Sequence, residues 1–545
     1  MREPAEPVSP RESRPAVSAR WWLLVHAAVT AVVVGVLCAP RQLVLMDGGL
    51  HLSSAAAVRG LAAGRWTDLL TWKVVVAPNL LVEVLTFGLA TWLDGDVVVR
   101  GVAILLVLGF SAAVLGLARA VGAPLWTATL ALPFAANVAL MAGLLGFAAA
   151  TVLAVVTVAA ALADLRRPRA VIASLLVLTW FTHLIPALSA AVAVALVLLV
   201  RGGLRQAASV GGSGLLAVAL LTGAFALTGG SDGGVASGWF GGGARAADLT
   251  KAVASWSRWE YQIIRPLTVL LLVVVVLALA VRLRRWRTRG APLLLPADGV
   301  LAAAAVLGAL AVVTPETIGS VSLTATRLAV LPPVLLTAWV GAQVGPRGTF
   351  AVRGERRTRV GRAGVVLVTV TTVAAALVTV GLGAARVGPL TAEGERLAEV
   401  RSTAACAPRG GTIVQLNADD GHERAVTLRP DTSFVGYVAD DAGLLDLGNV
   451  SGTASYYVWA YTDRARAVPA LAPSQDALET APPEVDLLAA VRSGFPLDSV
   501  LVVGTPDPTD AGWAPTGRAL SATFRPVATT PAGSLWVRQG ITSGC

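Results

Sequence analysis

Long apolar runs recur along the chain, and they constrain its fold more than any other feature. A run of about 20 apolar residues spans the hydrocarbon core of a bilayer as one helix. Such runs cover residues 21–40, 97–118, 125–142, 146–163, 170–184, 186–201, 207–228, 264–283, 294–314, 324–344 and 364–384. Only 14% of the residues are charged, whereas soluble domains carry about 25%. The pattern therefore predicts a polytopic α-helical membrane protein with about eleven transmembrane helices.

Arginine-rich connections between these runs predict how the helices are oriented. The strongest are DLRRPR at 164–169, VRLRRWRTRG at 281–290 and GPRGTFAVRGERRTRVGR at 345–362. Weaker ones are marked by Arg119 and by Arg201 with Arg205. Because basic loops stay in the cytoplasm, all of them belong on the cytoplasmic side. This clustering accounts for the net charge of +10, and no nucleic-acid partner is predicted.

The segment LLVEVLTFGLATWL at 80–93 decides which loops face outward. It contains Glu83 and follows Pro78-Asn79, which favours an interfacial helix lying on the membrane. If it does not cross, every basic loop lies inside together with the N-terminus. The loop 41–96 and everything after about residue 385 are then extracytoplasmic. We expect a multi-pass protein of the plasma membrane, with a disordered cytoplasmic tail (1–20), a transmembrane domain (21–384) and an extracytoplasmic soluble domain (385–545).

The last 160 or so residues change in character, which predicts a separate α/β or α+β domain. Short apolar runs bounded by Gly, Pro and Asp are typical of strands, and PEVDLLAAVRSGF at 483–495 reads as an amphipathic helix. The strand candidates are TIVQL (412–416), SVLVVG (499–504) and SLWVRQ (534–539). Cys406 and Cys545 both fall in this region. We expect a disulfide between them if the domain faces an oxidising compartment.

The first outer loop opens with LVLMDGGLHLSSAAAVRG (43–60), which places Asp47 and His51 four residues apart just after a membrane helix. Asp47 has two interpretations: it caps the following helix, or it is a carboxylate that deprotonates a hydroxyl or binds a cation. His51 lies one turn later on the same face. It either bonds a phosphate or assists Asp47, or it is an ordinary histidine of the headgroup region.

Two further candidates lie on the outer side at helix ends. In TWFTHLIPAL, His183 ends one apolar run before Pro186 begins the next. An intramembrane histidine is a functional candidate, although a hydrogen bond to a backbone carbonyl at the helix end would also satisfy it. Arg327 lies inside an apolar helix against the positive-inside trend. Its anionic partner is Glu316, a lipid headgroup or a substrate phosphate, unless the side chain only snorkels to the interface. Trp259 lies in an outer aromatic belt and is a further candidate to contact substrate.

The arrangement resembles the GT-C superfamily of membrane glycosyltransferases. An anchor helix, an outer Asp a few residues later, interfacial helices, many further spans and an outer C-terminal domain carry the resemblance. The string MDGGLHLSSA is also similar to the "DGPxHL" opening of uncharacterised bacterial members. LPFAANVALMAGLLGF (132–147) and TWFTHLIPAL resemble the segments that follow it. The resemblance covers about the first 330 residues.

The resemblance implies a hexosyl- or pentosyltransferase that takes its sugar from a polyprenyl-phosphate carrier. The acceptor would be an extracytoplasmic glycan, lipid or protein of the cell envelope. Asp47 would match the first-loop carboxylate, Glu83 would lie on the second interfacial helix, and Arg327 would bind the carrier phosphate. Many members carry a second acidic residue in the next outer loop, but 138–147 has none and offers only Asn137 nearby. A divalent cation is therefore possible and not required.

Two other functions remain open from the sequence. One is a transporter, whose signature would be charged pairs at mid-membrane or inverted repeats with broken helices. The other is a non-catalytic scaffold for envelope polymer assembly. Convergence of Asp47, His51, Glu83, His183 and Arg327 at one outer site would favour the transferase, whereas scattered positions would favour the scaffold.

Overall fold

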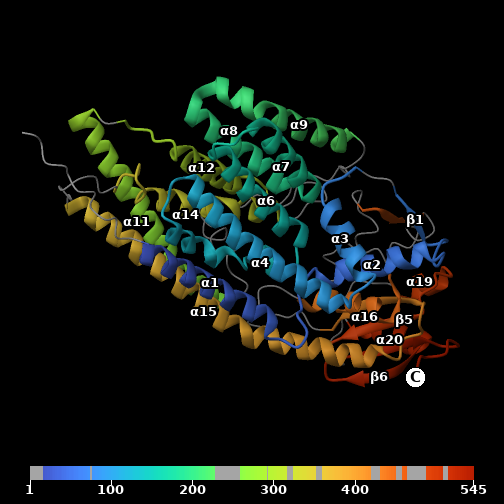
Figure 1. The fold of residues 1–545 in the computed structure, drawn as a ribbon. Coiled ribbons are helices and arrows are strands. Elements are labelled where there is room, and N and C mark those ends of the chain that lie inside the picture. The colour runs from blue at the N-terminus through green and yellow to red at the C-terminus, as the bar shows by residue number, and fades with distance from the viewer. Residues whose placement is uncertain are drawn as a thin grey trace, which may run out of the picture.

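The computed structural model describes residues 16–73, 76–227, 258–290, 292–315, 323–350, 359–418, 430–449, 457–462, 487–506 and 513–545. Most of the chain before residue 405 is helical (Figure 1). The predicted tail 1–20 lies outside the described residues except for its last five positions, which begin the first helix.

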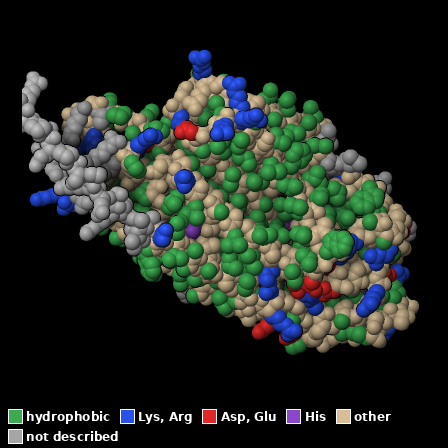
Figure 2. Space-filling view, in the orientation of Figure 1, with side chains coloured by type: hydrophobic (Ala, Val, Ile, Leu, Met, Phe, Trp, Pro, Cys, Tyr) green, Lys and Arg blue, Asp and Glu red, His purple; other side chains and the backbone are tan. Residues whose placement is uncertain are grey.

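The membrane part is a bundle of apolar helices. Its long members are α1 (Ala16–Cys38), α4 (Gly95–Ala120), α6 (Leu145–Leu162), α7 (Pro168–Thr182), α8 (Leu184–Gln206), η2 (Ala207–Gly211), α9 (Gly212–Leu227), α11 (Arg258–Arg289), α12 (Asp298–Val313), α14 (Leu331–Ala342) and α15 (Arg359–Ala404). In the described part of the chain, seven helices are long and apolar enough to cross a membrane, and four apolar helices are shorter. The count of eleven crossings stays a prediction. On the face seen in Figure 2, hydrophobic side chains cover the middle of the bundle, and charged side chains gather toward its ends.

Two elements differ from the predicted membrane runs. The run 125–142 is not one helix: it divides into the 3-10 helix η1 (Leu125–Phe134) and the short α5 (Val138–Met141). Pro133 lacks an amide hydrogen, and the Asn137 side chain accepts a hydrogen bond from the Leu140 amide (3.1 Å), which starts a new helix. The predicted span 364–384 is part of α15, which continues to Ala404 and runs along the bundle to the C-terminal sheet (Figure 1).

The segment 80–93, which the sequence predicts to lie on the membrane surface, forms helix α3 (Leu80–Ala90). Its 11 residues span about 16 Å, which is too short to cross a bilayer core of about 30 Å. It packs on α2 (Gly48–Ala62), which begins directly after Asp47.

The C-terminal region is a five-stranded mixed sheet of order β3-β2-β5-β7-β6. The elements are β2 (Thr412–Asn417), η3 (Pro430–Ser433), α16 (Phe434–Ala442), β3 (Leu445–Asp446), α19 (Leu487–Arg492), β5 (Ser499–Val503), α20 (Trp513–Thr523), β6 (Phe524–Thr530) and β7 (Gly533–Arg538). The three predicted strands are confirmed as β2, β5 and β7, and the predicted helix contains α19. Strands β2 and β5 pair in parallel and are buried throughout, as parallel strands usually are. Cys406 and Cys545 form the expected disulfide.

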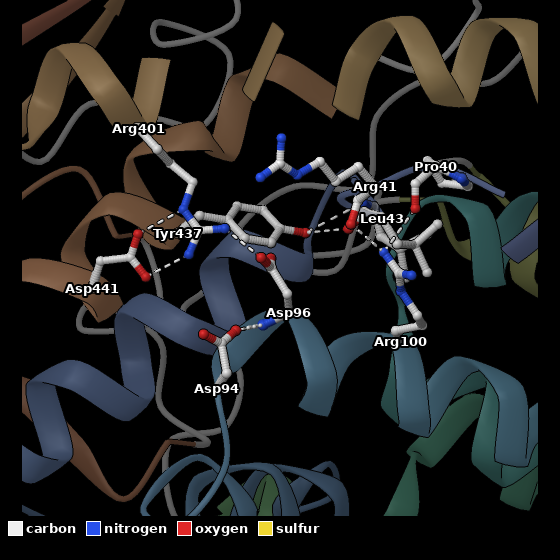
Figure 3. Close-up of polar contacts among 10 residues, drawn as sticks. Pro40, Arg41, Leu43, Asp94, Asp96, Arg100, Arg401, Tyr437 and Asp441 are labelled. Atoms are coloured by element: carbon white, nitrogen blue, oxygen red, sulfur yellow. Dashed lines mark hydrogen bonds and ion pairs between the residues drawn. The ribbon is translucent and has the colours of Figure 1, made fainter. Parts of the chain in front are cut away.

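The C-terminal region packs directly on the first outer loop. Strand β1 (Leu70–Trp72) pairs antiparallel with β4 (Trp459–Tyr461). Figure 3 shows a second contact, in which Arg401 at the end of α15 donates to Asp441 of α16 (2.5 and 2.6 Å) and to Asp96 of α4. The Tyr437 hydroxyl lies 3.3 Å from the Leu43 carbonyl oxygen. These contacts hold residues 41–96 against the sheet domain.

Candidate functional site

Asp47 occupies the N-cap position of α2, yet its side chain makes no capping hydrogen bond. Its backbone is held instead, because the Asp47 amide donates to the Ala142 carbonyl oxygen (2.8 Å) in the turn before α6. The residue is half-buried. The capping interpretation therefore does not account for the carboxylate, which remains available for another partner.

His51 connects α2 to two other elements. Its Nδ1 lies 2.9 Å from the Glu83 Oε1 of α3, and its Nε2 lies 3.0 Å from the Gly143 carbonyl oxygen. An imidazolium donates from both ring nitrogens, and both acceptors here are oxygens. The ring is buried and orients the first outer loop against the turn before α6.

Burial and neighbouring charges set the protonation of this pair. Burial raises the pKa of Asp47 to about 6, although the nearby charges of His51 and Arg327 oppose the rise. Burial alone would lower the pKa of His51, but the carboxylates of Glu83 and Asp47 outweigh it and raise this pKa to about 9. Near pH 7 the site therefore holds an ionised Asp47 of unusual basicity beside a protonated His51.

Glycines allow the backbones around Asp47 to approach closely. Gly143 has a φ of +76°, and a Cβ there would lie 2.7–2.8 Å from the backbone nitrogens of Gly48 and Asp47. On the other face of α2, Gly49 contacts the backbone of Ser433 and Gly436, and any side chain at Gly49 would collide with them. The glycine pair after Asp47 thus lets α16 pack directly behind the carboxylate, a role that the sequence did not predict.

Arg327 and His183 also belong to the cluster around Asp47, His51 and Glu83. Arg327 lies in the short helix α13 (Thr324–Leu328), and its charge acts on both Asp47 and His183. His183 caps α8 by accepting a hydrogen bond from the Ile185 amide at Nδ1 (3.2 Å), and its ring contacts the edge of Phe147. The helix-end interpretation of His183 is therefore correct in kind, although the partner is an amide and not a carbonyl.

One face of α3 presents unsatisfied polar atoms to the site. Among the described residues, Asn79 Oδ1, Glu83 Oε2 and Thr86 Oγ1 are buried without a hydrogen-bond partner. Glu83 and Thr86 lie three residues apart on the same side of α3, and Asn79 is the residue before its first turn. Buried polar atoms are normally paired, so these oxygens, next to the ion pair of Glu83 with His51, are candidates to bind a ligand. Asn79 and Thr86 were not predicted; their spacing from Glu83 was the available signal.

The structure brings together five of the seven candidates: Asp47, His51, Glu83, His183 and Arg327. Glu316 lies outside the described residues, as does the side chain of Trp259. The next residue, Glu260, forms a buried ion pair with Arg386 of α15 (2.6 Å). Within the described ranges no group of three His, Cys, Asp or Glu is arranged to bind a metal.

Comparison with known proteins gives a match in structure and not in sequence. No protein-family model and no curated protein sequence matches the chain. The crystal structure of ArnT from Cupriavidus metallidurans, bound to undecaprenyl phosphate, superposes with a TM-score of 0.55. The match covers 97% of this chain and 100% of ArnT, at 15% sequence identity. This protein has the GT-C fold. The GT-C fold predicted from the layout of helices and loops is thereby confirmed, and so is a multi-pass membrane protein. The narrower "DGPxHL" likeness, which rests on a short motif, stays a prediction.

Proposed function

We propose that this protein is a glycosyltransferase that moves a sugar from a polyprenyl-phosphate carrier to an extracytoplasmic acceptor. The acceptor class is a cell-envelope glycan, lipid or protein. The observation that carries the proposal is the convergence of Asp47, His51, Glu83 and Arg327 beside the unsatisfied face of α3. The fold shared with ArnT, which was crystallised with undecaprenyl phosphate, supports the choice of carrier.

In this proposal Asp47 is the general base. It takes the proton from the acceptor hydroxyl, whose oxygen then forms a bond to the anomeric carbon of the sugar. The bond from that carbon to the phosphate oxygen breaks, and the polyprenyl phosphate leaves with the electron pair. A pKa of about 6 keeps Asp47 ionised at neutral pH while leaving it basic enough to accept a proton.

Positive charge stabilises the leaving phosphate. Arg327 has the guanidinium geometry that binds phosphate oxygens in pairs. Protonated His51 adds a second positive charge close to Asp47. Such pre-arranged charges lower the free energy of a transition state in which negative charge develops on the leaving group. Glu83 acts as a positioning residue, because it keeps His51 protonated and oriented.

The proposed orientation puts this site on the extracytoplasmic side. It follows from the arginine-rich connections, which lie at the opposite ends of the same helices. The lipid tail of the donor would remain in the bilayer next to the bundle, which explains why the reaction would need a membrane domain.

The test compares wild type with Asp47→Asn in purified protein reconstituted in lipid. A panel of radiolabelled polyprenyl-phosphate sugars supplies the donor, and sugar release or transfer is measured. We expect Asp47→Asn to lose about 10²–10⁴-fold in turnover, the usual contribution of a general base.

Asp94→Asn is the matched control, since Asp94 lies in the same outer loop and accepts a real capping hydrogen bond from the Asp96 amide (2.9 Å). Asn caps helices as well as Asp, so turnover should stay unchanged. Equal turnover in wild type and Asp47→Asn would contradict the assignment of the base. No turnover and no donor binding in wild type would instead favour the scaffold or the transporter.

A further inference from the structure

A polar cavity of about 390 Å³ lies at the end of the bundle opposite to Asp47. It is lined by the end of α4 and the turn after it, the end of α6, the C-terminal part of α8, one residue of α11, the segment before α12 and the turn after α14. Four arginines line it: Arg119, Arg201, Arg282 and Arg347. Asp164 is the one acidic side chain in the lining and is fully exposed.

The helix lengths separate this cavity from the proposed catalytic site. Helix α6 begins at Leu145, next to the turn that contacts Asp47, and ends at Leu162, which lines the cavity. Its 18 residues span about 27 Å. That length is close to the thickness of the hydrocarbon core. The cavity therefore lies at the opposite membrane surface, and it is distinct from the site around Asp47.

Two of the four arginines already form hydrogen bonds or ion pairs within the protein. Arg282 is buried and donates to Asp298 (2.6 and 2.7 Å), Gln343 and Thr349. Arg201 donates to the last carbonyl oxygens of α6, Ala161 (3.0 Å) and Leu162 (2.6 Å). These bonds neutralise or orient both groups, so they form the rigid floor of the cavity.

The other two arginines form no such bonds among the described residues. Within the described residues, Arg119 and Arg347 make no ion pair and no side-chain hydrogen bond, and both are exposed. Arg119 lies in the last turn of α4 and Arg347 in the turn after α14. These segments are in close contact because Gly345 packs against the Gly122 carbonyl oxygen. Two guanidinium groups without an ion pair in the described chain thus flank one concave surface, whose floor is formed by arginines that already have partners.

We propose that this cavity binds a phosphate group, most directly that of an anionic phospholipid in the adjacent leaflet. Paired guanidinium groups bind phosphate oxygens through charge-assisted, often bidentate hydrogen bonds. The cavity has the size of ordinary small-molecule sites, so a phosphate with its glycerol fits. Its place at the membrane surface matches the basic pockets between transmembrane helices that bind lipid headgroups. A soluble phosphate would use the same contacts, and the experiment separates the two.

The experiment measures lipid and phosphate binding by native mass spectrometry and by thermal unfolding. Full-length protein is placed in phosphatidylcholine nanodiscs with a small fraction of phosphatidylglycerol, phosphatidic acid or, as a phosphate-free lipid, diacylglycerol. Inorganic phosphate and pyrophosphate are added separately to nanodiscs without anionic lipid. The test variant is Arg119→Gln/Arg347→Gln.

The matched control is Arg166→Gln/Arg205→Gln, which removes two exposed arginines from the same end of the bundle but outside the cavity. We expect wild type to retain the anionic phospholipid over diacylglycerol. The cavity variant should bind it about thirtyfold more weakly, because it loses two guanidinium groups that contact the phosphate and each contributes on the order of 1 kcal/mol. The control should stay within about twofold of wild type.

The outcomes are distinguishable. Loss of lipid retention in the cavity variant alone supports a lipid phosphate. Stabilisation by pyrophosphate that the cavity variant alone loses, without lipid retention, supports a soluble phosphate compound. Equal loss of binding in both variants would mean that binding follows overall surface charge. If wild type bound neither the lipid nor the soluble phosphates, the cavity would not be a phosphate site. Either of these last two results overturns the proposal.

Discussion

Two buried clusters of charged side chains lie at opposite ends of the bundle, and they differ in how completely their hydrogen bonds are satisfied. Around Arg282, every partner is filled. Asp298 accepts from Arg282, from the Trp339 indole (2.8 Å) and from the Leu295 amide (2.7 Å). Arg282 uses its remaining donors on Gln343 and Thr349. A buried ion pair of this kind holds three helices and a turn in one arrangement.

The cluster around Asp47 is incomplete by comparison. Asp47 has no capping bond, and Glu83 and Thr86 each keep a buried oxygen without a partner in the described chain. An unsatisfied buried polar atom costs stability of about 1–3 kcal/mol, and such costs persist where a ligand completes the set. The saturated cluster stabilises the fold, whereas the unsaturated one is the site to which the proposed function assigns binding and chemistry.

The largest effect should come from breaking the saturated cluster. Asp298→Ala leaves the Arg282 guanidinium buried without its counter-ion, which costs about 3–5 kcal/mol in the free energy of unfolding. Measured above pH 9, where His51 has already lost its proton, Glu83→Gln should cost about 1 kcal/mol or less, because the carboxylate no longer stabilises an imidazolium. Thermal unfolding in one detergent compares the two variants. Similar destabilisation by both would show that the clusters do not differ in the way described here.

A smaller effect should follow from disturbing the packing behind Asp47. Gly49→Ala places a methyl group against the Ser433 backbone and pushes α16 away from α2. We expect a loss of about 1–3 kcal/mol in stability, as for other overpacked contacts. Displacement of Asp47 should also reduce turnover by up to about 10²-fold. Gly101→Ala is the control, since nothing lies within 4 Å of a Cβ at Gly101. If both alanines left turnover unchanged, α16 would not position the carboxylate.

The smallest effect concerns the pH dependence of the proposed reaction. Turnover should rise as pH increases through about 6, where Asp47 ionises, and fall through about 9, where His51 loses its proton. Glu83→Gln removes the main charge that raises the His51 pKa, so the fall in turnover at high pH (the upper limb of the curve) should move toward pH 6.5. The rise in turnover near pH 6, which follows Asp47, should move much less. An unchanged upper limb would mean that His51 is not required in its protonated form.

The raised pKa of His51 also predicts how the free energy of unfolding depends on pH. Its folded pKa of about 9 exceeds the unfolded value of 6.5. Its contribution is therefore fully present below pH 6.5 and is lost as pH rises through about 9. Glu83→Gln should flatten the dependence of the unfolding temperature on pH in this window.

The sequence by itself determined the class of the protein and named the candidate residues in the segment after the first helix. Runs of about 20 apolar residues leave no soluble alternative, because the backbone of a membrane span must satisfy its own hydrogen bonds. Short apolar runs bounded by Gly, Pro and Asp were enough to predict the strands around Val414, Val502 and Leu535 in the C-terminal sheet. A carboxylate and an imidazole four residues apart after an anchor helix marked Asp47 and His51 as candidates.

Only the tertiary structure decided how those groups act. Whether Asp47 is a cap depends on where its oxygens lie, and whether His51 is charged depends on Glu83, 32 positions further along the chain. The role of Gly49 required a helix almost 400 residues away. The arginines that the sequence marked only as cytoplasmic proved to share one cavity. Apolar periodicity is local and can be read along the chain, whereas pKa values, unsatisfied atoms and close backbone contacts arise from segments that meet only after folding.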